Sequence, residues 1–292
     1  MCIAFSGIFY RFADVSPDTA TVFRCLYGLP ILGLVAWAEH RRHGPLPWPT
    51  VRLAAIAGIF FAADLTFWHH AIEAVGAGLS TVLGNLQVIV VGVVAWLFLG
   101  ERPTRQSLLA IPIILAGVVL ISGLVGSGAY GADPRLGVLL GVLTAIAYAG
   151  YLIVIRRGGR DARRAAGPVA VSTASTALVA VVIGLVVGDL DPVPSWPAHG
   201  WLALLGVTSQ SAGYLLISIS LPRLPSLLVS IILLAQPVAT VILSRILLAE
   251  TPSVVQVIGV VLVVGGIGLA TVPVAKLRDA VRGAVGQPVA DG

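Results

Sequence analysis

The sequence predicts an all-α, polytopic membrane protein with about ten transmembrane helices, arranged as two inverted five-helix repeats. The composition indicates the membrane class: of 292 residues, 58% are hydrophobic and 11% are charged, and the mean hydropathy is +0.99. That balance leaves too little polar surface for a soluble domain. An internal repeat predicts the two halves, and the distribution of arginines predicts how each half is oriented.

The repeat joins residues 76–121 to residues 225–270. Five matched pairs share one offset of 149 residues: Gln87 with Gln236, Leu99 with Leu248, Glu101 with Glu250, Pro103 with Pro252, and Gly117 with Gly266. An offset of about half the chain indicates an internal duplication. In a membrane protein, two related halves are typical of a transporter whose binding site lies where the halves meet.

Apolar runs near 20 residues, the length that crosses a bilayer core, predict nine helices. They span residues 16–38, 51–73, 76–99, 105–125, 136–157, 167–188, 198–220, 224–248 and 253–273. Ser16, Thr104 and Ser253 stand where N-caps belong, and Pro17 takes the first helical position. A tenth run, residues 1–13, reaches only about 20 Å. We expect this first helix to be short, or truncated with its true start upstream of Met1.

The cations predict the orientation. With the N-terminus inside, 14 of the 18 Lys and Arg residues fall in inside loops or in the C-terminal tail, and only Arg11, Arg135 and Arg245 fall outside. This positive-inside pattern predicts a cell (inner or plasma) membrane protein with both termini cytoplasmic. The first repeat covers residues 1–125, the second 136–273, and a cytoplasmic tail 274–292. Five spans per half is an odd number, so the halves lie in opposite directions.

Asp64 lies near the middle of the span 51–73. An intramembrane carboxylate costs about 2.5–3.5 kcal/mol on insertion scales, so it normally faces a partner or a wet cavity. Arg24 and Asp64 lie at nearly equal depth, roughly 12 and 13 Å from the outer ends of their spans. The sequence leaves two roles open for Asp64: an ion pair with Arg24, or a proton-carrying or amine-binding group.

Further polar and aromatic residues predict a midplane cavity with aromatic walls and a few polar anchors. The candidates for substrate binding are Asp64, Trp68, Gln87, Gln210, Tyr214 and Gln236. Helix packing is the alternative for each of them. Asn85 and Gln87 are about 200° apart on a regular helix, so we expect only one of them to face the cavity. Pro237 should kink its span, whereas the first repeat has Val88 at the corresponding position.

Glu101 and Glu250 each precede x-Pro-Thr or x-Pro-Ser at a helix entrance. A carboxylate there complements the positive helix N-terminus, so capping is the leading prediction and gating the alternative. His69 and His70 are expected one turn from the outer surface, solvated unless they shuttle protons. No phosphate-binding Gly-rich motif and no metal-ligand spacing occurs, so neither ATP, a metal nor another cofactor is expected.

These residues together resemble the repeat of EamA-domain carriers of the drug/metabolite transporter superfamily. The resemblance rests on residues 84–104, 236–252 and 147–157, and on Ser16-Pro17 followed by Arg24. It implies a ten-helix bundle of inverted halves, cytoplasmic ends and a central cavity. Members of the family mostly export or exchange small metabolites, amino acids among them.

We therefore predict a secondary transporter, an exporter or exchanger of a small metabolite such as an amino acid, working by alternating access. The partners expected are a small-molecule substrate and the lipid bilayer, with protons as candidate coupling ions and no nucleic acid. A homodimer is left open. The first alternative is an intramembrane enzyme acting on a lipid or lipid-linked substrate, which would need clustered acids, whereas Asp64 is the only intramembrane acid that we predict. A non-transporting scaffold or sensor is the second alternative.

Overall fold

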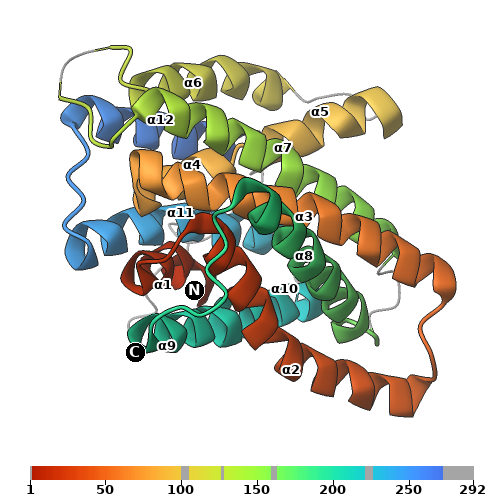
Figure 1. The fold of residues 1–292 in the computed structure, drawn as a ribbon. Coiled ribbons are helices and arrows are strands. Elements are labelled where there is room, and N and C mark those ends of the chain that lie inside the picture. The colour runs from red at the N-terminus through yellow and green to blue at the C-terminus, as the bar shows by residue number, and fades with distance from the viewer. Residues whose placement is uncertain (1, 100–104, 126–127, 159–162, 221–225, 272–292) are drawn as a thin grey trace, which may run out of the picture.

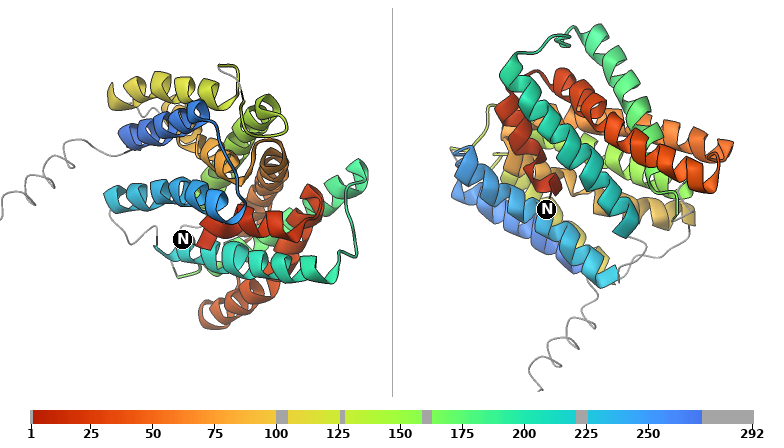
Figure 2. Two further views of the ribbon diagram at one scale, coloured as in Figure 1. Left: turned by 90° about the vertical axis from the view of Figure 1, so that its left-hand side faces the viewer. Right: turned by 90° about the horizontal axis from the view of Figure 1, so that it is seen from below.

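The computed structural model shows a bundle of helices packed side by side, with their axes roughly parallel or antiparallel (Figures 1 and 2). The structure describes residues 2–99, 105–125, 128–158, 163–220 and 226–271, and it has no strand among them. The elements are the 3-10 turn η1 (Cys2–Phe5), the π-helical η2 (Gly206–Gly213) and the α-helices α1 (Ser6–Ala13), α2 (Pro17–His43), α3 (Trp48–Val75), α4 (Ala77–Gly84), α5 (Gln87–Leu99), α6 (Arg105–Ile121), α7 (Pro134–Gly158), α8 (Ala166–Val187), α9 (Trp196–Leu205), α10 (Tyr214–Ser220), α11 (Ser226–Leu247) and α12 (Val254–Thr271).

The helices have the length and apolarity of membrane spans. Among the described residues, six helical segments are long and apolar enough to cross a bilayer: Pro17–His43, Trp48–Val75, Ala77–Val94, Pro134–Gly158, Ala166–Val187 and Trp196–Ile219. Ile3–Ala13, Arg105–Ile121, Ala235–Leu247 and Val254–Ala270 are shorter apolar helices. Large apolar side chains such as Val186, 82% exposed, stand on the outside of the bundle, as expected where lipid replaces water. The structure thus supports an all-helical, polytopic membrane protein.

The predicted span 76–99 is broken into α4 and α5 at Asn85 and Leu86. The Asn85 side-chain amide donates to the carbonyl of Thr81 (2.8 Å), and side chains of this type compete with the helical ladder. The next backbone bonds shorten to three residues, from Leu86 to Leu83 and from Val88 to Asn85. The sequence pointed to Pro237 as the distorting residue instead. The structure describes α11 as one helix through Pro237, so the kink there stays a prediction.

A π-helical segment, Gly206–Gly213, lies between α9 and α10 inside the predicted span 198–220. The hydroxyl of Ser211 lies 3.0 Å from the carbonyl oxygen of Gly206, five residues earlier, and 3.0 Å from that of Gly28 on α2, so its one proton can be donated to either. The backbones approach closely here, because a Cβ on Gly206 would lie 2.8 Å from the carbonyl oxygen of Arg24. Single π turns inside α-helices are frequent at functional sites.

Helices α6 and α12 pack through glycines. A Cβ on Gly117 would lie 2.7 Å from the carbonyl oxygen of Gly259 and 2.9 Å from the backbone nitrogen of Val263, and a Cβ on Gly259 would lie 2.7 Å from the carbonyl oxygen of Gly117. Backbone atoms cannot move aside as flexible side chains do. Small residues at such crossings let helices associate where lipid provides no hydrophobic driving force.

We expect Gly117→Ala to destabilise the protein by about 1–3 kcal/mol, because the added methyl group overpacks a backbone contact. Gly265→Ala on α12 is the matched control, since nothing lies within 4 Å of a Cβ there and Ala is the better helix former. The measurement is the thermal unfolding midpoint of the purified protein in detergent. Equal midpoints for the two variants would contradict the close approach of α6 and α12.

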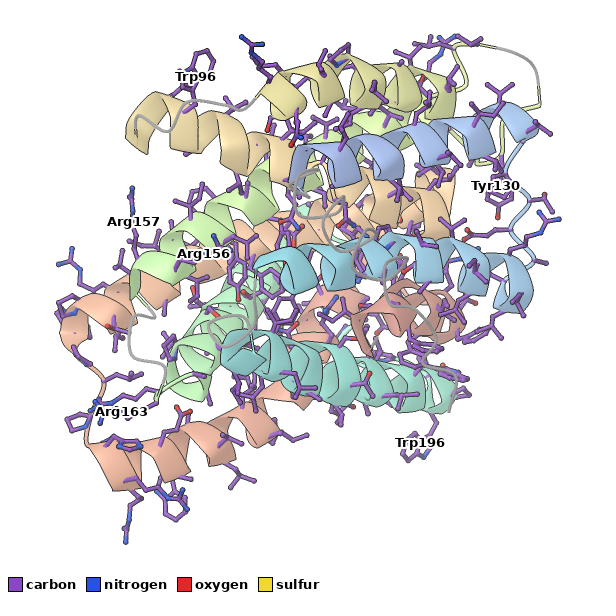
Figure 3. All side chains as sticks on the ribbon, turned by 180° about the vertical axis from the view of Figure 1, so that it is seen from behind. Trp96, Tyr130, Arg156, Arg157, Arg163 and Trp196 are labelled. Atoms are coloured by element: carbon purple, nitrogen blue, oxygen red, sulfur yellow. The ribbon has the colours of Figure 1, made fainter. Side chains whose placement is uncertain are left out.

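The two ends of the bundle differ in charge. Figure 3 shows Arg156, Arg157 and Arg163 at one end, here called the arginine end, with Tyr130 at the other, here called the Tyr130 end. At the arginine end, the guanidinium of Arg164 donates to the carbonyls of Pro45 and His43. The loops after α2 and α7, both predicted to be inside, therefore lie together.

Candidate functional site

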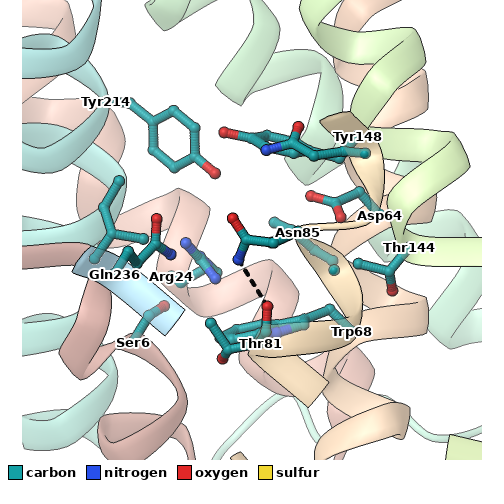
Figure 4. A pocket seen from close by; sticks show the side chains of 14 residues that line it. Ser6, Arg24, Asp64, Trp68, Thr81, Asn85, Thr144, Tyr148, Tyr214 and Gln236 are labelled. Carbon is teal, nitrogen blue, oxygen red and sulfur yellow. Dashed lines mark hydrogen bonds between the residues drawn. The ribbon is translucent and has the colours of Figure 1, made fainter. Parts of the chain in front are cut away.

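A polar cavity lies inside the bundle (Figure 4). It holds about 70 Å³ of water-accessible space, which is room for roughly five water molecules or a ligand of a few heavy atoms. Helices from both predicted halves enclose it. The lining residues are Ile3, Ser6, Arg24, Asp64, Leu65, Trp68, Thr81, Gly84, Asn85, Gln87, Thr144, Tyr148, Tyr214 and Gln236. Five of the six candidate substrate-binding residues are in this set.

Asp64 and Arg24 both line the cavity, but they do not pair. Asp64 is 6% and Arg24 is 1% exposed, and both are among the described residues, yet no salt bridge joins them within the 4.0 Å limit for an ion pair. Figure 4 shows them entering the cavity from different sides. The predicted ion pair is therefore wrong in this conformation. The sequence placed both residues at similar depth but could not give their direction around the helix.

Gln210 does not line the cavity; it lies behind Arg24. Its side-chain oxygen accepts from Nε of Arg24 (3.2 Å), and its side-chain nitrogen donates to the hydroxyl of Thr173 on α8 (3.0 Å). Gln210 and Thr173 are both 0% exposed. The expectation that Gln210 faces the cavity was wrong, because the π-helical segment directs it toward α2.

Asn85 and Gln87 both line the cavity, contrary to the expectation that only one could. The break between α4 and α5 removes the regular 100° step on which that expectation rested. The side-chain oxygen of Gln87 is buried without a hydrogen-bond partner. Gln236 approaches from α11, so the two repeat-related glutamines meet at one cavity.

Aromatic side chains form one wall. The ring of Phe61 packs against Tyr151 and Tyr214, with centroids 4.6 and 5.0 Å apart, and Tyr148 stacks on Tyr151 at 5.8 Å. Trp68 follows Asp64 by one turn on the same helix, as predicted from the spacing. Ring pairs at these distances attract each other in addition to burying apolar surface, which stabilises the wall.

Several polar residues of the site were not predicted as such. Ser6, Thr81 and Thr144 line the cavity, and the hydroxyls of Ser6 and Thr144 are buried without a partner. Short hydroxyl side chains are common in membrane helices, so neither spacing nor composition marks these three. The unpartnered hydroxyls of Ser6 and Thr144 add to the polarity that a ligand would meet.

Asp64 is not the only buried acid in these helices. Asp18, in the first turn of α2, is 0% exposed; one carboxylate oxygen accepts from the hydroxyl of Thr66 (3.4 Å) and the other has no partner. The prediction of a single intramembrane acid was therefore wrong. Asp18 does not line the cavity.

His69 is buried rather than solvated, with 0% exposure. The hydroxyl of Thr21 donates to the carbonyl of Pro17 (2.9 Å) and lies 2.8 Å from Nδ1 of His69. Which group donates in the second contact depends on the tautomer of His69. The other ring nitrogen, Nε2, is buried without a partner.

Glu250 caps a helix of the other predicted half. Its carboxylate accepts from the backbone N–H groups of Ala77 (2.6 Å) and Gly78 (3.1 Å), the first two residues of α4. Gly76 has a φ of +88°, and a Cβ there would lie 2.9 Å from the carboxylate, so only glycine fits. Sequence predicted capping but implied the helix that follows Glu250, which is α12.

Tyr130 lies close to this cap. Its N–H donates to the side chain of Gln256 (2.7 Å). Burial raises the pKa of Tyr130, and the nearby carboxylate of Glu250 raises it further. The cap therefore lies at the Tyr130 end. Glu101, the repeat counterpart of Glu250, lies outside the described residues, as do residues 272–292 with the predicted tail.

A bundle of apolar helices around a cavity with polar side chains in its lining is typical of a membrane transporter. The chain belongs to the EamA-like transporter family, whose sequence pattern matches residues 1–123 and 135–272. This confirms the resemblance seen in the sequence.

Relatives and a solved structure agree with the family. The chain is 24% identical to uncharacterized transporter sll1319 of Synechocystis sp. over 268 residues, 85% of this chain and 77% of that protein. It is 22% identical to uncharacterized transporter YxxF of Bacillus subtilis over 276 residues, 91% of this chain and 85% of that protein. A crystal structure of a protein with 20% identity superposes with a TM-score of 0.60, covering 92% of this chain and 98% of the other, which shows a shared fold. The family and these names point to a transporter rather than an enzyme.

Proposed function

We propose that this protein is a secondary transporter that exports a small polar metabolite, such as an amino acid or related compound, by alternating access around the cavity. One observation carries the proposal: two buried, oppositely charged side chains, Asp64 and Arg24, line one cavity without pairing. Burying either charge without a partner is costly. A cavity that leaves both open suits a ligand or ion that arrives and leaves.

The helix contacts support two inverted halves. A twofold axis would exchange each membrane span with the span five positions away in the chain. The contact between α3 and α7 would then correspond to the contact between α9 and α1, and the contact between α3 and α8 to that between η2 and α2. The pairs α2 with α8, α4 with α11 and α6 with α12 map onto themselves. All of these contacts occur in the structure, as expected for a pseudo-twofold axis in the membrane plane.

The arginine end is the cytoplasmic end in this proposal. The basic loops gathered there agree with the positive-inside rule, and we propose a cell membrane as the location, with both termini in the cytoplasm. Glu250 and the α4 N-terminus then lie at the outer face. The cap joins the second half to the first, so it closes the outer side of the cavity and must release for outward opening.

We expect Glu250→Ala to weaken this closure, because two backbone N–H groups would lose a charged acceptor, at a cost of about 1–3 kcal/mol. The measurement is labelling of Thr81→Cys from outside by a membrane-impermeant maleimide, with Cys2 and Cys25 replaced by Ser; labelling should rise. Glu39→Ala is the matched control, since Glu39 caps Ala166 and Gly167 of α8 in the same way at the arginine end. Equal labelling in both variants would remove Glu250 from the gate.

Coupling follows from competition at Asp64. The carboxylate binds either a proton or a cationic group of the substrate, but not both. It therefore releases one and binds the other when the cavity opens to the opposite side of the membrane. A proton gradient directed inward then drives the substrate outward. Asp64 is suited to this role because it is buried, unpaired and within the cavity.

The test is a comparison of metabolites inside and outside cells with and without the gene, followed by transport of the affected compound into proteoliposomes. Selective accumulation of one compound class in cells lacking the gene, with proton-driven movement in proteoliposomes, is the expected result. No metabolite difference and no gradient-driven transport of any compound in the affected class would refute the proposal.

A further inference from the structure

We propose that Arg24, held in place by Gln210, is the anion-binding residue of the cavity, and that the substrate is a small zwitterion with its carboxylate on Arg24 and its ammonium group on Asp64. This rests on the transport function proposed above. It assigns to Arg24 a role other than pairing with Asp64.

The guanidinium of Arg24 is buried and has an unused donor. Arg24 is 1% exposed, its Nε donates to Gln210, and its Nη1 is buried without any partner. A permanently charged guanidinium left with an unused donor lacks an anion. Figure 4 shows the guanidinium pointing into the cavity, beside Asn85 and Gln236.

Gln210 supports Arg24 from behind. Hydrogen bonds of 3.0 and 3.2 Å join the side chain of Gln210 to those of Thr173 and Arg24. Of these three residues, Arg24 alone lines the cavity. A Cβ on Gly28 would lie 2.9 Å from Cγ of Gln210, so glycine makes room for this side chain. The π-helical segment departs from regular helix geometry and thereby places the side-chain oxygen of Gln210 beside Arg24. This neutral acceptor orients the guanidinium without neutralising its charge.

The cavity also offers acceptors for a cationic group. Asp64 offers its carboxylate, and the unpartnered side-chain oxygen of Gln87 is another acceptor in the same lining. A cationic group fits there, as an anionic group fits at Arg24. With roughly 70 Å³ of water-accessible space, the cavity suits a small molecule that carries both charges.

The test uses the full-length protein and three matched panels: the standard L-amino acids, the primary amines that lack their carboxylate, and the carboxylic acids that lack their amine. Affinity is measured by titration calorimetry in detergent. We expect at least one amino acid to bind about tenfold or more tightly than both its counterparts, since each charged hydrogen bond contributes that much or more. Arg24→Gln should reduce its affinity to that of the amine and leave the amine within about twofold.

Gln210→Glu keeps the shape of the side chain and tests the inference if Arg24→Gln fails to fold. The new carboxylate takes the guanidinium charge, so the preference for the amino acid over the amine should fall by about tenfold. Thr173→Val is the matched control, because it removes only the far hydrogen bond of Gln210, and it should keep the preference. A purely structural role of Gln210 would lower both affinities together and leave their ratio unchanged.

Three results would overturn the inference: an amine that binds as tightly as its amino acid, an Arg24→Gln protein with unchanged preference, or no amino acid bound at all. Proton-driven transport of a compound without a carboxylate would overturn it as well, while leaving the proposed transport function intact.

Discussion

Replacing Asp64 by Asn should abolish proton-driven accumulation of substrate but preserve exchange of substrate for substrate. Asn keeps the size and hydrogen-bonding capacity of the side chain and can neither carry a proton nor hold a charge. For one-for-one exchange at zero membrane potential, a gradient of two pH units supports about a hundredfold accumulation, since each tenfold ratio corresponds to 1.4 kcal/mol. The variant should reach no accumulation.

The measurement is transport of labelled substrate in proteoliposomes, with and without a pH gradient. Exchange at equal pH on both sides should persist in Asp64→Asn. It should require a raised substrate concentration, because the cationic group of the substrate loses its partner and binds more weakly. Asp18→Asn is the control: Asp18 is also a fully buried carboxylate, but it lies outside the cavity, so accumulation should remain. An unchanged pH dependence in Asp64→Asn would exclude Asp64 as the coupling group.

Sequence predicts positions along each helix better than directions around it. Hydropathy and helical rise predict similar depths for Asp64 and Arg24, and both residues line one cavity. Whether they pair depends on helix rotation and on neighbours such as Gln210, which come from another part of the chain. Depth is a local property, whereas pairing is a tertiary one.

The errors at Gln210 and at Asn85 with Gln87 both fall where the helix is irregular. The expectation for Asn85 and Gln87 assumed a regular step of 100° per residue, and the break after Gly84 departs from it. Gln210 was expected at the cavity as one of several polar residues of its span, and it lies in the π-helix of residues 206–213. Departures of this kind depend on competition between side chains and the backbone ladder. They occur where the cavity lies, so regular geometry is least reliable at the site itself.

Glu250 shows what a local signature leaves undetermined. The pattern Glu-x-Pro-Ser indicates a carboxylate near a helix N-terminus, and the carboxylate indeed caps one. The capped helix is α4, whose sequence lies about 170 residues earlier. No local pattern specifies a partner so distant, yet this partner is what makes the cap a candidate gate.

A disulfide between Gly78→Cys and Ser244→Cys should stop transport, and reduction should restore it. These positions belong to α4 and α11, the N- and C-terminal ends that meet beside Glu250. A Cβ on Gly78 would lie 2.6 Å from the hydroxyl oxygen of Ser244, close enough for a disulfide, whose Cβ atoms are about 3.8 Å apart. Alternating access requires this end to open in every cycle, so a covalent bond across it should lower the rate by more than about tenfold.

The background for this experiment has Cys2 and Cys25 replaced by Ser, and the two single-cysteine proteins are the controls. Oxidant should inhibit only the double variant, and dithiothreitol should reverse the inhibition. Full transport by the cross-linked protein would mean that α4 and α11 move together as one unit. Opening would then have to occur elsewhere on the Tyr130 end, and the cap by Glu250 would be a fixed joint between the halves rather than a gate.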